Sequence, residues 1–223
     1  MFKTKVFQLG SAFGIPLYVD ISFLFIAVLV LMCGMGFLFG VLITVGFGFS
    51  ILAHEFGHCL VARKYRCRTR KITLSMLGGC AELESIPKVP KQEMLVALAG
   101  PGTSLALAVV FSVVAFLFCR VAFLFQSFTV LSGLNAGLGF FNLLPGFPMD
   151  GGRILRAWLS RKKPRQDATR TAMNVGRVFA ALFACWGVFN IMSGNIGGLI
   201  SLLISWFIWQ AGWQEYMASV YGG

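Results

Sequence analysis

The sequence has few charged residues and only two histidines. Only 12% of its 223 residues are charged, and it contains eight acidic residues and two histidines. Hydrophobic residues make up 57% of the chain, and the mean hydropathy is +0.80. A soluble domain carries about 25% charged residues. The composition therefore excludes an ordinary soluble domain and predicts a membrane protein.

Two further signals are missing. The chain starts MFKTKVFQLG, with no short apolar segment before a small-residue cleavage site, so we expect no removable signal peptide. The cysteines form no C-x-x-C pair and no regular spacing, so neither a zinc knuckle nor a disulfide framework is predicted. We expect small buried thiols at Cys33, Cys59, Cys67, Cys80, Cys119 and Cys185.

Long apolar segments are abundant. Crossing a bilayer takes about 20 apolar residues. Six segments approach this length, at about 20–34, 37–62, 93–118, 125–144, 172–192 and 196–213. We therefore predict an all-α polytopic membrane protein with about six transmembrane helices, in which residues 1–223 form a single core without a separate soluble domain.

The positive charges predict how the chain crosses the membrane. The net charge is +11, and lysines and arginines gather at 3–5, 63–71, 88–91 and 153–177, with Arg120 apart. If both termini are cytoplasmic, every cluster except Arg120 falls on the cytoplasmic side, as the positive-inside rule requires. The charges thus indicate a multi-pass protein of the cell membrane, with the lipid bilayer and not nucleic acid as partner.

A short β segment is predicted between the second and third spans. RKITLSML and CAELESI flank a pair of glycines, a pattern typical of two strands around a turn. We predict a β-hairpin at 70–86, inserted between helices.

Both histidines lie in the pentapeptide HEFGH, within the second span. Because a helix repeats every 3.6 residues, His54 and His58 project from one face and Glu55 lies on a neighbouring flank. This is the arrangement of a zinc-binding pair with a carboxylate beside it. So short a motif can arise by chance, but ionisable groups inside a membrane segment are costly and indicate function.

A catalytic zinc takes three protein ligands and keeps one position for water. The chain has no third histidine, so the third ligand must be a carboxylate or a thiolate. Most acids lie at span ends, in a basic loop or beside the hairpin, which leaves Asp150. Its context, FFNLLPGFPMDGGR, breaks the helix, and irregular backbone at membrane depth is tolerated beside a water-filled cavity. The alternative is that Asp150 only caps the following helix.

HEFGH and NLLPGFPMDGGR, in this order, resemble the two signatures of the site-2 protease family of intramembrane zinc metalloproteases. The AGP stretch at 99–101, the hairpin and the six spans extend the resemblance over most of the chain. It implies that His54, His58 and Asp150 bind one Zn²⁺ per chain and that Glu55 activates the attacking water. It also implies that Asn142 orients the substrate backbone or stabilises the developing oxyanion.

Many members of the closest branch carry paired regulatory domains of the cystathionine-β-synthase type after the last span, and this sequence shows none. The expected function is hydrolysis of a peptide bond within or near a transmembrane segment of a membrane-protein substrate. Such a segment must first unwind, and an edge of the hairpin could hold it by strand addition. Two alternatives remain open, a metal-binding membrane transporter and a catalytically silent membrane scaffold. The substrate and the oligomeric state also remain open.

Overall fold

The computed structural model describes residues 6–23, 25, 28, 36–75, 78–84, 87 and 89–221. The chain forms two compact units. One contains Met1–Pro87 and Ala99–Phe140, and the other contains Lys88–Leu98 and Phe141–Gly223. Most of the expected first span, 20–34, lies outside the described residues.

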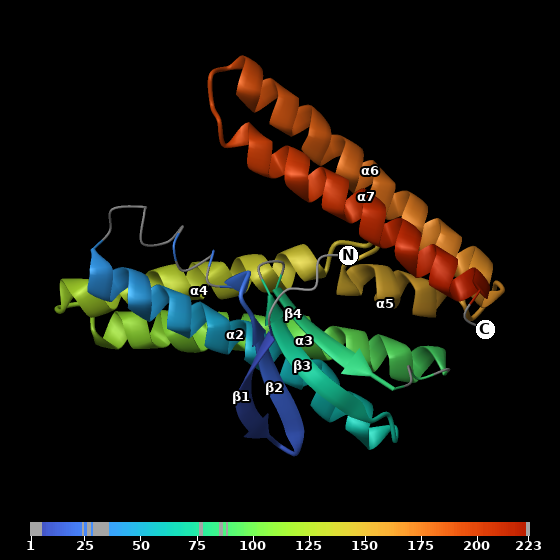
Figure 1. Cartoon of the computed structure of the whole chain (residues 1–223), viewed down its shortest axis with the longest axis horizontal. Helices are drawn as coiled ribbons and strands as arrows, with labels where there is room; N and C mark the ends of the chain where they lie inside the picture. Colours follow the sequence, from blue (N-terminus) through green and yellow to red (C-terminus); the bar gives the residue numbers. More distant parts are fainter. Residues whose placement is uncertain are drawn as a thin grey trace. The chain divides into compact units, whose positions relative to one another are not determined.

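Four helices of the described part are long and apolar enough to cross a membrane. They match four of the six expected spans (Figure 1) and are α2 (Phe37–Lys64), α3 (Pro90–Leu117), α4 (Ala122–Asn142) and α6 (Arg165–Met192). The last expected span, 196–213, lies in helix α7 (Gly198–Tyr221), which is not among these four. The prediction of a helical membrane protein with a small β insertion is confirmed.

The β insertion is larger than the sequence predicted. The expected hairpin at 70–86 is present as β3 (Thr69–Ser75) and β4 (Gly78–Leu83). Two N-terminal strands that were not predicted, β1 (Val6–Ala12) and β2 (Ile15–Asp20), complete a sheet of order β1-β2-β3-β4. The pairs β1–β2 and β3–β4 are antiparallel, whereas β2–β3 is parallel. A bulge between Gln8 and Gly10 interrupts the alternation of side chains between the two faces, from which a strand is predicted.

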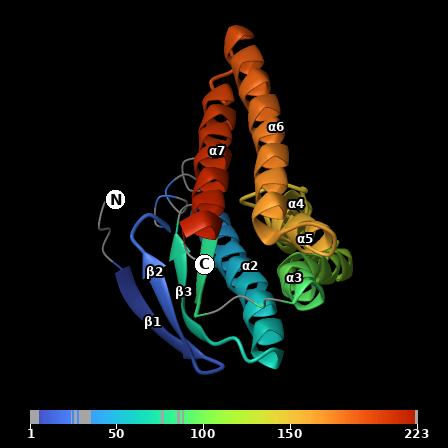
Figure 2. The ribbon, with the colours of Figure 1, turned by 90° about the vertical axis from the view of Figure 1, so that its right-hand side faces the viewer.

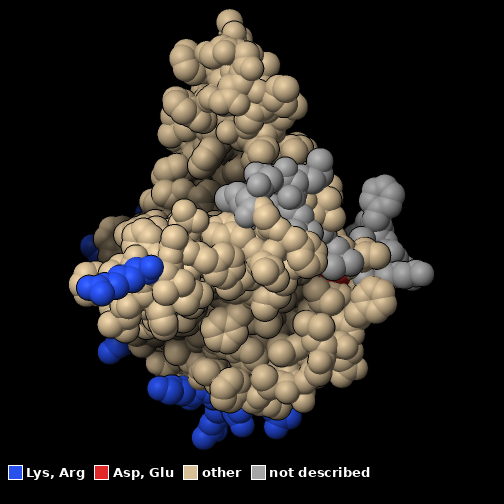
Figure 3. Space-filling model, turned by 90° about the vertical axis from the view of Figure 1, so that its left-hand side faces the viewer, with Lys and Arg blue, Asp and Glu red and all other residues tan. Residues whose placement is uncertain are grey.

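The outer faces of the spanning helices fit a lipid environment. On α2, large side chains such as Phe37, Leu38 and Val45 are 67–73% exposed. A soluble monomer rarely exposes contiguous apolar surface on this scale. Most of the surface shown in Figure 3 is likewise uncharged, with lysines and arginines along its left edge and its lower part. These faces are therefore suited to contact lipid chains.

Helices α6 and α7 form an antiparallel hairpin and lie side by side in Figures 1 and 2. A glycine allows their close approach, because a Cβ at Gly187 would lie 2.8 Å from the carbonyl oxygen of Gly198. The guanidinium of Arg177 packs over the ring of Trp209, 4.6 Å from its centroid. This cation–π contact accommodates a charge within an apolar helix pair.

Candidate metal centre

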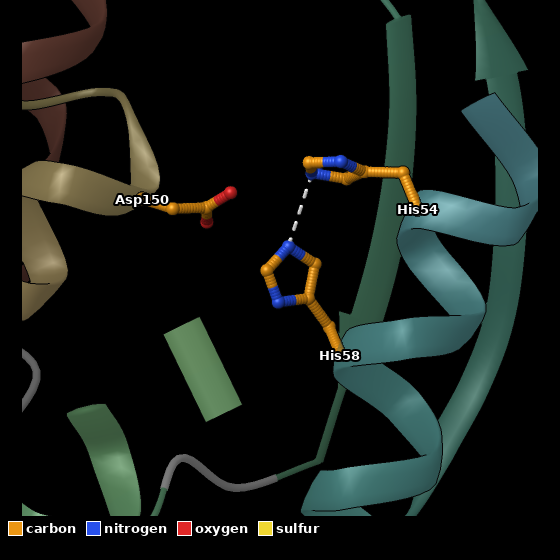
Figure 4. Close-up of side chains that lie close together, drawn as sticks. All are labelled: His54, His58 and Asp150. Carbon is orange, nitrogen blue, oxygen red and sulfur yellow. Dashed lines mark hydrogen bonds between the residues drawn. The ribbon is translucent and has the colours of Figure 1, made fainter. Parts of the chain in front are cut away.

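The two histidines lie one turn apart on α2, 4% and 6% exposed, and their rings converge. The Nε2 atoms of His54 and His58 are 3.2 Å apart (Figure 4). On the other side of its ring, Nδ1 of His54 lies 2.9 Å from Oγ of the buried Ser104. If Nδ1–H donates to that hydroxyl, Nε2 keeps a lone pair for a metal ion. Ser104 therefore sets the orientation of the His54 ring.

The ring of His58 packs against Gly100 of α3. A Cβ at Gly100 would overlap the Nε2 atom of His58. At Gly102, two residues on, a Cβ would meet nothing within 4 Å. Only the first of the two glycines in AGPG is therefore required by the site. This stretch is part of the family resemblance, and the structure shows that the imidazole of His58 packs against its first glycine.

Glu55 is half-buried and its side chain lies against β4. A Cβ at Gly79 would lie 2.9 Å from both Cδ and Oε1 of Glu55. The carboxylate is thus one residue along the chain from a candidate ligand and next to the last strand of the sheet. A group in this position can exchange a proton with a molecule bound beside the histidines.

Asp150 is the first residue of helix α5 (Asp150–Leu159) and is 8% exposed. The N-cap residue is Met149, whose side chain makes no capping hydrogen bond, and Asp150 is the acidic residue in the first turn of the helix. The preceding loop packs closely on the glycines of DGG. A Cβ at Gly151 would overlap the carbonyl oxygen of Leu144, and one at Gly152 would lie 2.5 Å from the Gly146 carbonyl carbon. This packing holds the start of α5 against the loop.

Asn142, expected from the family resemblance to contact substrate, is the last residue of α4 and is partly buried. Its role stays a prediction. Ser104, Gly100 and Gly79 were not predicted as parts of the site. The AGPGTS stretch was the only signal in the sequence that could have drawn attention to the first two.

Within the described residues, one group of three or more potential metal ligands is present, consisting of His54, His58 and Asp150. All three are buried, and their ligand atoms lie within 4.8 Å of one another (Figure 4). Two nitrogens at Zn–N distances of about 2.0–2.1 Å from a tetrahedral zinc would be about 3.3 Å apart, close to the 3.2 Å between the Nε2 atoms. Two imidazoles and a carboxylate are a donor set that zinc accepts. The residues present fit this metal.

A helical membrane fold that carries such a donor set beside a glutamate defines the class of membrane-bound zinc metalloproteases. The chain matches the model of Peptidase family M50 over residues 42–126 and 119–183. It is 36% identical over 212 residues to a zinc metalloprotease of Methanocaldococcus jannaschii, covering 93% of this chain and 60% of that protein. It is 32% identical over 143 residues to stage IV sporulation protein FB of Bacillus subtilis, covering 63% of this chain and 48% of that protein.

The solved structure of the site-2 protease from Methanocaldococcus jannaschii has the same fold, with a TM-score of 0.69, 32% sequence identity and 95% of each chain covered. The chain belongs to peptidase family M50, the site-2 protease family. It spans only about half to three-fifths of the length of these two curated relatives.

Proposed function

We propose that this chain is an intramembrane zinc metalloprotease that hydrolyses a peptide bond within or near a transmembrane segment of a membrane-protein substrate. One observation carries the proposal. His54, Glu55 and His58 lie inside the 28-residue apolar helix α2, and the two histidines form a ligand group with Asp150. Membership of the site-2 protease family supports this function over a metal transporter or a silent scaffold.

In this proposal His54, His58 and Asp150 would hold the zinc, and Nδ1–H of His54 would donate to the Ser104 hydroxyl, which leaves the Nε2 lone pair to the metal. Bound zinc lowers the pKa of water to about 7 and polarises a carbonyl group. Glu55 takes the proton from the water that attacks the scissile carbonyl and returns it to the leaving amine. Asn142 would contact the substrate backbone or the developing oxyanion.

The proposal predicts about one zinc per native chain, and peptide-bond cleavage that stops when the metal is removed. The test is to reconstitute the purified protein in liposomes with a reporter transmembrane segment, strip the metal with a chelator and add zinc back. Cleavage should disappear and return in step with zinc content, and Asp150→Ala should recover neither. Native protein that takes up no zinc when it is supplied would refute the metalloprotease function.

The proposed orientation places both termini in the cytoplasm. Arg63 and Lys64 occupy the last turn of α2, and further lysines and arginines follow at 66–71. Under the positive-inside rule this end of α2 is cytoplasmic. His58 and His54 lie about two and three turns before that end, so the proposed cleavage site is nearer the cytoplasmic face.

The sheet offers a place for an unwound substrate. Peptide bonds of a helix are enclosed by their own hydrogen bonds, so the cleaved segment must become extended before water reaches it. Strand β4 ends the order β1-β2-β3-β4 in the described part of the chain, and the Glu55 carboxylate lies against its Gly79. A strand added beside β4 would lie about 4.8 Å away, next to Glu55. We propose that the substrate binds here by strand addition.

Proline scanning of β4 tests this substrate site. Proline has no N–H to donate to an added strand, and successive residues of a strand direct their N–H groups to opposite edges. One variant carries proline at Cys80 and a second carries proline at Ala81. In one of the two, the lost N–H faces the added strand. That variant should keep its thermal stability and cleave about tenfold more slowly, the scale of one lost hydrogen bond. Zinc content should not change, and Gln8→Pro on the opposite edge should have no effect on cleavage. Native cleavage rates in both β4 variants would contradict strand addition.

A further inference from the structure

The second unit contains a buried network of charged residues outside the metal centre. Glu93, near the start of α3, and Arg156, on α5, are each 2% exposed. Nε and Nη2 of Arg156 donate to Oε1 of Glu93 at 2.8 and 2.6 Å, and Nη1 donates to Oε1 of Glu215 on α7 at 2.8 Å. Arg165, at the start of α6, donates to the other oxygen of Glu93 at 2.8 Å. Arg156 thus joins α5 to the ends of two other helices.

Stability alone does not explain this network. Taking two charges out of water costs several kcal/mol per ion, and replacing a buried ion pair by apolar residues of similar volume is often neutral or stabilising. The geometry indicates a positional role instead, because all the guanidinium nitrogens of Arg156 have acceptors and the planar group is held from two sides. Such a planar group is fixed in orientation, which a single ammonium would not be.

Arg156 also contacts the loop before Asp150. Its guanidinium carbon lies 4.8 Å from the ring centroid of Phe147, which is 1% exposed. The backbone N–H of Phe147 donates to the carbonyl oxygen of Ala172 on α6 at 3.2 Å. Phe147 precedes Asp150 by three residues and Arg156 follows it by six, within the same ten-residue helix. The guanidinium of Arg156 therefore links the two backbone segments that flank Asp150: it contacts Phe147 in the loop before Asp150, and Arg156 itself lies on the helix after it.

We propose that Arg156 is the positioning residue of Asp150. Glu93 and Glu215 fix its guanidinium, and through Phe147 and α5 it holds the carboxylate of Asp150 in place for the metal. This inference rests on the proposed function, because it requires Asp150 to be a zinc ligand. It assigns a role to an arginine and a glutamate that lie 63 positions apart in the sequence.

The test is the double variant Glu93→Gln/Arg156→Met in the full-length protein in detergent. It removes the charges of Glu93 and Arg156 together, and their former partners Arg165 and Glu215, whose side chains are 39% and 27% exposed, stay accessible to water. Thermal stability of the zinc-free protein should be near that of the native chain. Zinc affinity, measured by competition with a chelator, should fall about 10- to 100-fold, as for residues that orient metal ligands. A purely structural network predicts native affinity in this variant, because no buried charge is left unpaired.

Two controls complete the design. Arg70→Met/Glu84→Gln makes the same replacements in an exposed pair, with side chains 69% and 45% exposed, and should keep native zinc affinity. Arg156→Lys keeps the charge but loses the planar fork, so its affinity should be intermediate. If the double variant does not fold, native affinity in Arg156→Lys overturns the inference. If the native protein binds no zinc, both the proposed function and the role of Arg156 are overturned. If the native protein and the double variant bind zinc with equal affinity, only the role of Arg156 is overturned.

Discussion

Glu55→Gln is expected to keep its zinc and to cleave about 10²- to 10⁴-fold more slowly, the contribution of a general base. Glutamine has nearly the volume of glutamate, so it should fit against Gly79 where the carboxylate now lies. It cannot accept a proton, and Glu55 is not among the grouped ligands, so the metal should stay. The measurement is single-turnover cleavage of a transmembrane reporter, with zinc per chain determined on the same sample.

The matched control for Glu55→Gln is Asp167→Asn, the same loss of charge at an exposed position of α6. It should cleave at the native rate. Native cleavage by Glu55→Gln would show that another group takes the proton. Loss of zinc together with activity would show that position 55 supports the metal, contrary to the assignment.

Gly100→Ala is expected to abolish zinc binding as completely as the replacement of a zinc ligand would. The added methyl group would overlap the imidazole of His58, which would have to leave its place opposite His54. Alanine is favoured over glycine within a helix by about 1 kcal/mol, so the helix itself should not be weakened. The expected result is a folded protein whose zinc content falls from about one to near zero per chain, with cleavage lost in parallel.

Gly102→Ala is the control for this prediction. It adds the same methyl group to α3 two residues away, where a Cβ meets nothing within 4 Å. Zinc content and cleavage should stay native and thermal stability should be equal or slightly higher. If Gly100→Ala also keeps its zinc, the packing of His58 on α3 is not needed for metal binding.

The sequence by itself determined the features that depend on local periodicity or on the small number of residues of one type. Helical repeat places His54 and His58 on one face wherever that helix lies, so the pair could be predicted before any fold was known. Apolar runs predict the spans for the same reason, and four of them are confirmed. Asp150 could be singled out because the chain has only eight acidic residues and most lie at positions unsuited to the site.

Only the tertiary structure decided which distant residues meet. The parallel pairing of Leu17 with Ile72 joins an N-terminal hairpin to a strand about fifty residues away, and no local pattern encodes such a partner. Gly100 beside His58, and Arg156 beside Glu93, likewise depend on how helices pack. Local patterns fix which face a side chain occupies, whereas long-range packing fixes what that face touches. The candidate ligands could therefore be predicted from the sequence, whereas the residues that pack against them could not.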